Sequence, residues 1–115
     1  MSGLQAAFDR ADELGGAGRF FEAHEALEAL WMKAAGEEKL LLQGLIQVAA
    51  GLHRFKLNPA KTDGALYLLQ RGLAKLRKTE KLLAPGSLAP LAAAVGRIRS
   101  TRKAPPSLVF GLKAA

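Results

Sequence analysis

The sequence contains no cysteine, and this absence excludes several classes of protein at once. Disulfide scaffolds, zinc–thiolate sites, iron–sulfur clusters and thiol nucleophiles all need cysteine. A long apolar segment is also missing, because the longest run, residues 40–52, has 13 residues and is interrupted by Gln43 and Gln47. A membrane-spanning helix needs about 20 apolar residues. We therefore expect a soluble protein with no membrane partner.

The chain has 115 residues, which is enough for one domain with one hydrophobic core. Half of the residues are apolar, which excludes an intrinsically disordered polymer. Residues 1–10 lack the apolar core of a secretory signal and include Asp9 and Arg10, so we expect a cytoplasmic protein. We expect a single helical domain over residues 1–104, followed by a C-terminal tail, residues 105–115, that is either docked or flexible.

Acidic residues are scarce in the second part of the chain. Residues 1–38 carry eight acids and three bases, whereas residues 39–115 carry fourteen bases and only two acids. The two parts therefore have net charges of −5 and +12. A basic surface attracts nucleic acid through counterion release, but it is more often a solvated face paired with acids of the same chain. With one Trp and one Tyr for base stacking, we expect any nucleic-acid binding to be weak and non-specific.

The apolar residues recur every three to four positions, and no stretch alternates as a half-buried strand does. This pattern predicts an all-α fold, a single bundle of about five helices. The predicted helices cover residues 4–14, about 19–35, about 37–57 and about 61–83, with a fifth that begins at Ser87 or Pro90. The third is apolar nearly all round, so we expect it to be the buried central helix, with Gly44 and Gly51 on a face that another helix approaches closely. If the tail docks, we expect contacts through Leu108, Val109 and Phe110.

Polar residues interrupt the apolar faces of the second and third predicted helices at matching spacings. His24 lies on the apolar stripe of its helix, Glu28 follows one turn later, and Gln43 and Gln47 are likewise four residues apart. A short turn at Ala35–Gly36 predicts an antiparallel hairpin. Glu28 then lies opposite Gln43, and His24 opposite Gln47. We expect at least one direct hydrogen bond across the helices, because a buried amide without a partner costs about 1–3 kcal/mol.

The segment from Phe20 to Trp31, FFEAHEALEALW, resembles the HExxExxW signature of an uncharacterised prokaryotic family, domain of unknown function 309. Residues 43–53, QGLIQVAAGLH, and residues 63–69, DGALYLL, are similar to two later blocks of the same family. The resemblance covers about Phe8 to Leu83 and leaves out the basic region beyond Pro85. It implies a small helical bundle with a shared polar cluster, and it implies no reaction.

A metal or acid–base site is the sharpest interpretation of His24, Glu25 and Glu28. Zinc peptidases use HExxH, in which two histidines one turn apart bind the ion. In this chain Glu28 stands in place of the second histidine, and His53, the other histidine, is expected to lie far from His24 along the hairpin. We therefore expect no cofactor and no metal, although His24 and Glu28 are the residues that a metal would use.

Three functions remain open. The leading hypothesis is a non-enzymatic module that binds a protein partner or a small ligand at the polar hairpin, through candidate residues Trp31, Gln43, Gln47 and His53 beside His24 and Glu28. The second is a hydrolase-like or metal-dependent enzyme that uses His24, Glu25 and Glu28. The third is weak nucleic-acid binding through the basic part of the chain. The sequence leaves the ligand and the oligomeric state open.

A purely structural role is the alternative for the same cluster. In that interpretation Trp31 lies in the core and His24 is hydrogen-bonded to Gln47 or Glu28. The substitution His24→Ala would then lower the free energy of unfolding by about 1–3 kcal/mol. The substitution Glu25→Ala would lower it much less.

Overall fold

The computed structural model describes residues 3–115. All helices and strands assigned in this part of the chain are helices. The helices are α1 (Leu4–Gly16), α2 (Phe20–Trp31), α3 (Gly36–Leu57), α4 (Asp63–Lys78) and α5 (Ala89–Thr101), with a short 3₁₀ turn, η1 (Glu80–Leu82), between the last two. Within residues 3–115 the only strand-like pairing is an isolated bridge between Leu83 and Ala114. The predicted all-α class and the five helices are therefore confirmed. No helix of the described residues is long and apolar enough to cross a membrane.

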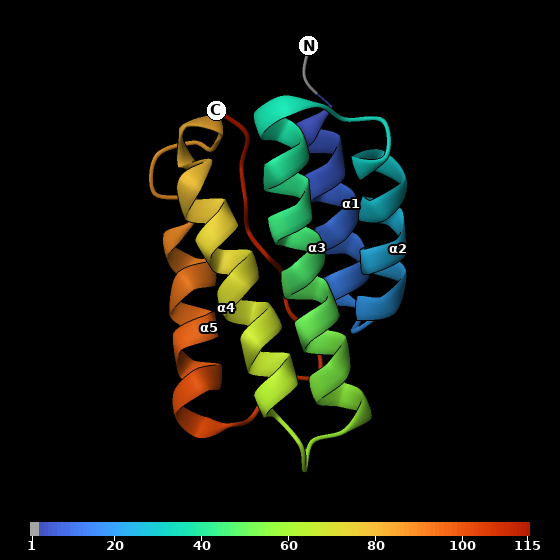
Figure 1. Ribbon diagram of the computed structural model, residues 1–115, viewed down its shortest axis with the longest axis vertical. Helices are drawn as coiled ribbons and strands as arrows, with labels where there is room; N and C mark the ends of the chain where they lie inside the picture. Colours follow the sequence, from blue (N-terminus) through green and yellow to red (C-terminus); the bar gives the residue numbers. More distant parts are fainter. Residues whose placement is uncertain (1–2) are drawn as a thin grey trace.

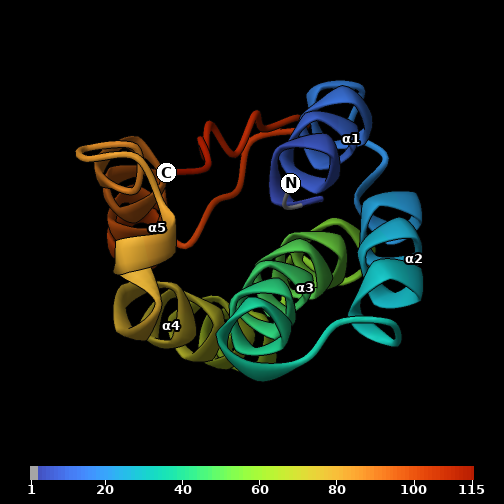
Figure 2. The ribbon, with the colours of Figure 1, turned by 90° about the horizontal axis from the view of Figure 1, so that it is seen from above.

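The five helices lie side by side in chain order, and seen from above they follow an arc from α1 to α5 (Figure 2). The helix α3 packs against both α2 and α4 in the middle of this arc. Nine of its residues are buried, among them Leu41, Leu45, Val48 and Leu52. The predicted role of this segment as the central helix is therefore confirmed. Its remaining face, toward α2, is only partly buried and carries the polar residues considered below.

The C-terminal tail runs along the opening of the arc, between α5 and α1 (Figures 1 and 2). Its backbone N–H groups donate to α1 at three levels, with distances of 2.8–2.9 Å: Leu108 to the Gly15 carbonyl, Phe110 to Asp12 Oδ1, and Ala114 to Gln5 Oε1. The arc is thus closed by hydrogen bonds to an extended segment rather than by helix α5 packing directly on α1. The division of the chain at residue 104 stays a prediction.

The side chains of the tail alternate between the core and the surface. Phe110 and Leu112 are each 1% exposed and join the hydrophobic core, whereas Val109 is 60% exposed. The expectation that Val109 docks beside Leu108 and Phe110 is therefore wrong. In an extended chain successive side chains point to opposite sides, so the neighbour of a buried Phe110 must face water and Leu112 takes the next inward position.

Two helix ends differ from the prediction. The helix α2 ends at Trp31 and not at residue 35, because i→i−3 hydrogen bonds from Lys33 and Ala34 turn the chain away, and Gly36, with φ +60°, begins α3 instead of stopping α2. The helix α4 ends at Lys78 rather than running to residue 83. The hydroxyl of the buried Thr79 donates to carbonyls of the last turn of α4, which satisfies groups that a helix end leaves unpaired.

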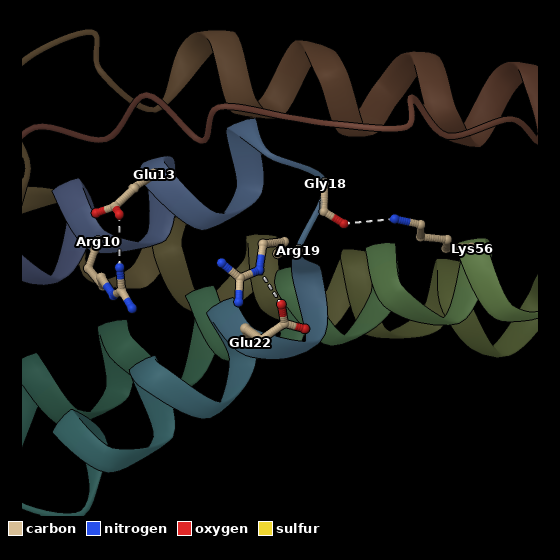
Figure 3. A network of polar contacts seen from close by, with 6 residues as sticks. All are labelled: Arg10, Glu13, Gly18, Arg19, Glu22 and Lys56. Carbon is tan, nitrogen blue, oxygen red and sulfur yellow. Dashed lines mark hydrogen bonds and ion pairs between the residues drawn. The ribbon is translucent and has the colours of Figure 1, made fainter.

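Polar contacts hold the corner between α1 and α2 (Figure 3). Arg19 donates a hydrogen bond to Glu22 on the first turn of α2, and this bond lowers the pKa of the Glu22 carboxyl. Lys56, near the end of α3, donates from Nζ to the Gly18 carbonyl oxygen at 2.9 Å. The far end of α3 is thus tied to the loop that joins α1 to α2.

The helices α3 and α4 approach each other most closely at paired glycines. A Cβ atom on Gly72 would lie 2.5 Å from the Gly44 carbonyl oxygen and 2.8 Å from Val48 Cγ2, and a Cβ on Gly44 would lie 2.8 Å from the Gly72 oxygen. Two turns further along α3, a Cβ on Gly51 would lie 2.9 Å from the Ala65 carbonyl oxygen. The prediction that Gly44 and Gly51 mark a face of close helix approach is therefore confirmed, with α4 as the helix that approaches.

We expect Gly72→Ala to lower the free energy of unfolding by about 1–3 kcal/mol, because the added methyl group has no space between the two helices. The control is Gly96→Ala on α5, where a Cβ would meet no atom within 4 Å. That substitution should raise the free energy of unfolding by about 0.5–1 kcal/mol, because Ala is the better helix former. Urea denaturation of both variants measures the difference, and a loss of stability at Gly96 equal to that at Gly72 would contradict the account.

Candidate functional site

A cleft of about 180 Å³ opens between α2 and α3, and we call it the α2–α3 cleft. It is lined by His24, Glu28 and Trp31 from α2 and by Gln43, Ile46 and Gln47 from α3. On each helix the lining residues are three or four positions apart and therefore share one face. The structure thus brings together five of the candidate residues that the sequence indicated, in the hairpin that the short turn predicted.

The expected direct hydrogen bond across the hairpin is not formed. Within the described chain, His24 and Glu28 make no hydrogen bond to Gln43 or Gln47. Instead His24 Nε2 lies 3.6 Å from Glu28 Oε2 on the same helix, which is an ion-pair distance but too long for a hydrogen bond. The expectation of a cross-helix bond is wrong because the cleft separates the two pairs, so their polar atoms face a shared space instead of each other.

His24 lies at the edge of the core rather than inside it. Its side chain is 28% exposed, yet its Nδ1 atom is buried and has no hydrogen-bond partner among residues 3–115. The ring of Phe21 stacks beside it, with the ring centres 6.1 Å apart. The structural interpretation, in which Gln47 or Glu28 satisfies His24 by hydrogen bonding, is therefore not supported by the geometry.

Trp31 is half-buried at the end of α2 and packs against the core. The ammonium of Lys39 lies 4.3 Å from the ring centre, which is a cation–π contact. The indole Nε1 atom is buried and makes no hydrogen bond within the described residues. Because an indole N–H can only donate, it needs an acceptor that the described residues do not supply.

Lys75 on α4 belongs to the same polar group, although it was not among the candidate residues that the sequence indicated. Its Nζ donates to Gln47 Oε1 at 2.8 Å. An ammonium group has no acceptor, so the amide oxygen of Gln47 faces Lys75, and the amide NH₂ group keeps both of its donors for other partners. Burial first, and then the charges of Arg71 and Lys78, lower the pKa of Lys75.

A signal for Lys75 is present in the sequence, but it needs the helix pairing to be interpreted. Lys75 follows Gly72 by three residues, and a Cβ on Gly44 would lie 2.9 Å from the Lys75 Cβ. The close crossing of α3 and α4 therefore places Lys75 beside the helix that carries Gln47. Without knowing that Gly72 faces Gly44, the spacing of Lys75 from its basic neighbours indicates only a cationic helix surface.

A second, smaller pocket of about 140 Å³ continues along the same side of the hairpin. It is lined by Phe21, His24, Ala50, His53 and Arg54. The ring of Phe21 lies between the two histidines, with its centre 6.1 Å from that of His24 and 5.2 Å from that of His53. Both histidines therefore line one pocket through their contacts with Phe21. The expected separation of His53 from His24 stays a prediction.

Glu25 lies outside both pockets. Its side chain is exposed and it lines neither the α2–α3 cleft nor the pocket shared by the histidines. Among residues 3–115, no three side chains of His, Asp or Glu stand together as a group that could hold a metal ion. The candidates for acid–base work in the cleft are therefore His24 and Glu28.

The family model described as domain of unknown function (DUF309) matches residues 8–68, which is more than half of the chain. The chain belongs to this family. Searches of curated proteins and of solved structures gave no significant match. The matched range contains α2 and α3, and with them every residue that lines the α2–α3 cleft. The DUF309 match ends inside α4, so Lys75, α5 and the tail lie beyond it.

We expect His24→Ala to lower the free energy of unfolding by less than about 1 kcal/mol. The substitution removes a partly exposed ion pair with Glu28 and a contact with Phe21, but no hydrogen bond. The control is Leu27→Ala on the same helix, which deletes a side chain that is 1% exposed and should cost about 2–5 kcal/mol. Urea denaturation of both variants measures the contrast, and comparable losses would show that His24 has a structural role.

Proposed function

We propose that this DUF309 protein is a non-enzymatic binding module whose α2–α3 cleft holds an amide group of a protein partner or of a small ligand. The observation that carries the proposal is the pair of buried, unpartnered nitrogens, Trp31 Nε1 and His24 Nδ1, on residues that line the cleft. A folded protein rarely leaves such atoms unsatisfied, and a bound group that accepts a hydrogen bond from the indole supplies the missing partner of Trp31 Nε1.

An amide fits the cleft better than a simple anion does. Its carbonyl oxygen accepts from the indole of Trp31 and from the amide NH₂ of Gln47, which Lys75 holds in a donating orientation. Its N–H group donates to the carboxylate of Glu28, which lines the same cleft. A carboxylate ligand would instead meet the like charge of Glu28 and would leave that acceptor without a donor.

The size of the cleft sets a limit on what it holds. A volume of about 180 Å³ is below the roughly 300 Å³ at which pockets for drug-sized molecules begin. One side chain or one peptide group fits this space, whereas a large cofactor does not. Because Trp31 Nε1 is covered in the unbound protein, the ligand reaches it by displacing a neighbouring side chain such as the half-exposed Glu28.

The enzyme hypothesis has less support from the site. Glu25, one of the three residues that it needs, is exposed and lies outside the cleft. His24 and Glu28 lie at an ion-pair distance of 3.6 Å without a hydrogen bond between them, and the cleft presents mainly hydrogen-bond donors and acceptors that orient a ligand. We therefore propose binding without turnover.

The single tryptophan of the chain makes the proposal directly testable by NMR. In ¹⁵N-labelled protein the one indole N–H signal reports on Trp31, and we expect acetamide to shift it in a saturable manner. Acetone, which only accepts, and acetate, which is anionic, should shift it less at the same concentration. The substitution Trp31→Phe should weaken acetamide binding by about fivefold, because one hydrogen bond is lost. In this variant, which has no indole, the NMR signals of the Gln47 side-chain amide measure the binding.

The matched control is Tyr67→Phe, which removes the phenolic hydroxyl group from an exposed ring on α4 and should leave acetamide binding unchanged. An indole signal that does not move with acetamide, or that moves equally with acetone and acetate, would contradict the proposal.

For nucleic acid we expect only weak and non-specific association. Several cations of the basic part already have partners: Lys75 bonds to Gln47, Lys81 pairs with Glu37 at 3.0 Å, and Arg102 pairs with Asp63 at 2.8 Å. A gel shift with a random duplex should show binding at low salt that is lost near about 150 mM. Each phosphate that the protein neutralises releases counterions from the nucleic acid, and this release favours binding less as the salt concentration rises. Binding that persists at that salt with a sequence preference would contradict this expectation.

A further inference from the structure

A large cavity lies away from the α2–α3 cleft and has no residue in common with it. Its volume is about 520 Å³, which is within the range of pockets that hold small molecules. It is lined by residues at the end of α3 and by residues 102–106, the segment that leads from α5 into the tail. Figure 1 shows the end of α3 and this segment at the same end of the bundle. The cleft proposed above and this cavity are therefore separate sites.

The floor of the cavity is apolar. Leu52 and Phe55 of α3 are nearly fully buried there, and Pro59 continues the surface beyond the end of the helix. The opposite wall is formed by Ala104, Pro105 and Pro106, which carry no polar side chain. An apolar ligand body gains free energy from contact with these surfaces because it leaves water.

The rim of the cavity is cationic. Lys56, Arg102 and Lys103 line it, and none of its lining residues is acidic. Arg102 is held by Asp63 and Thr62, and Lys56 is held by the Gly18 carbonyl. The ammonium of Lys103 makes no hydrogen bond or ion pair within residues 3–115, so it is the cation available to a ligand.

The wall on the tail side is fixed in place. Pro105 and Pro106 have restricted φ angles, and the Pro106 carbonyl oxygen lies against Gly18, where a Cβ would come within 2.6 Å of it. Gly18 has a φ of +75°, a backbone conformation that suits glycine. The cavity is therefore bounded by anchored segments on both sides, one of them tied to α3 through Lys56.

We propose that this cavity binds a small amphiphile with one anionic head group. The apolar body lies on Leu52, Phe55 and the proline wall, and the head group, a carboxylate or a phosphate, pairs with Lys103 at the rim. The charge of the rim selects the anion, and the apolar floor selects against inorganic anions and sugars. Nothing in this proposal depends on the α2–α3 cleft, so either proposal can fail alone.

The test uses the full chain and calorimetric titration with octanoate, octyl phosphate and the neutral octan-1-ol. We expect one of the two anions to bind at least about tenfold more tightly than octan-1-ol, since a hydrogen bond to a charged group is stronger than one to a neutral group. The comparison of the two anions identifies the head group. Inorganic phosphate, which lacks an apolar body, should not bind measurably.

Two variants and a control locate the site. Lys103→Ala should reduce the affinity for the anion to that for octan-1-ol, and Ala104→Leu should weaken both ligands by filling the cavity. Lys113→Ala removes an exposed cation of the tail that does not line the cavity, and it should leave the affinity unchanged. Because Lys103 is exposed, its variant keeps the fold, which a thermal melt verifies. Absence of binding by both anions, equal binding of octan-1-ol, or an unaffected Lys103→Ala variant would overturn the proposal.

Discussion

The contact between α3 and α4 at Gly44 and Gly72 fixes the geometry on which the rest of the structure depends. Each glycine faces the carbonyl oxygen of the other, so neither position has space for a side chain. This approach sets the rotation of α3 about its own axis. One face, with Gly44 and Gly51, is committed to α4, and the residues next to it, Gln43 and Gln47, are thereby turned toward α2. The same crossing places Lys75 within hydrogen-bond distance of Gln47.

The polar side chains between α2 and α3 include buried atoms without partners in the described chain, and this is the observation behind the proposal that they bind a ligand. A hydrophobic hairpin of the same shape would avoid a buried indole N–H and a buried imidazole nitrogen without partners, each of which costs free energy. Lys75 adds a charge whose pKa is lowered by burial, and its bond to Gln47 fixes the amide in one orientation. Polar groups that are oriented but unsatisfied are what a binding site keeps ready for its ligand.

The features that depend on the periodicity of the sequence were predicted correctly. The features that depend on local turns or on the pairing of helices were not predicted. The helical pattern predicted five helices and the central third one, and the four-residue spacings placed His24, Glu28, Gln43 and Gln47 around one space. The end of α2 and the outward position of the Val109 side chain could not be predicted, because they depend on local turn bonds and on the alternation of an extended tail. The place of Lys75 beside Gln47 can be predicted only once the pairing of Gly44 with Gly72 is known.

The most direct test of the binding proposal is to replace polar residues of the hairpin by apolar ones and to measure the free energy of unfolding. The measurement shows whether the polar cluster is needed for stability. In the triple variant His24→Leu, Gln47→Leu, Lys75→Met, the histidine and both members of the Lys75–Gln47 pair are replaced by side chains that need no partner. Replacing both partners of a hydrogen bond by apolar groups of similar shape is nearly neutral or stabilising. The account predicts that urea denaturation gives a free energy of unfolding equal to or above that of the original chain. A decrease of more than about 2 kcal/mol, well above the net contribution of a typical hydrogen bond, would show that the cluster holds the fold together and would contradict the account.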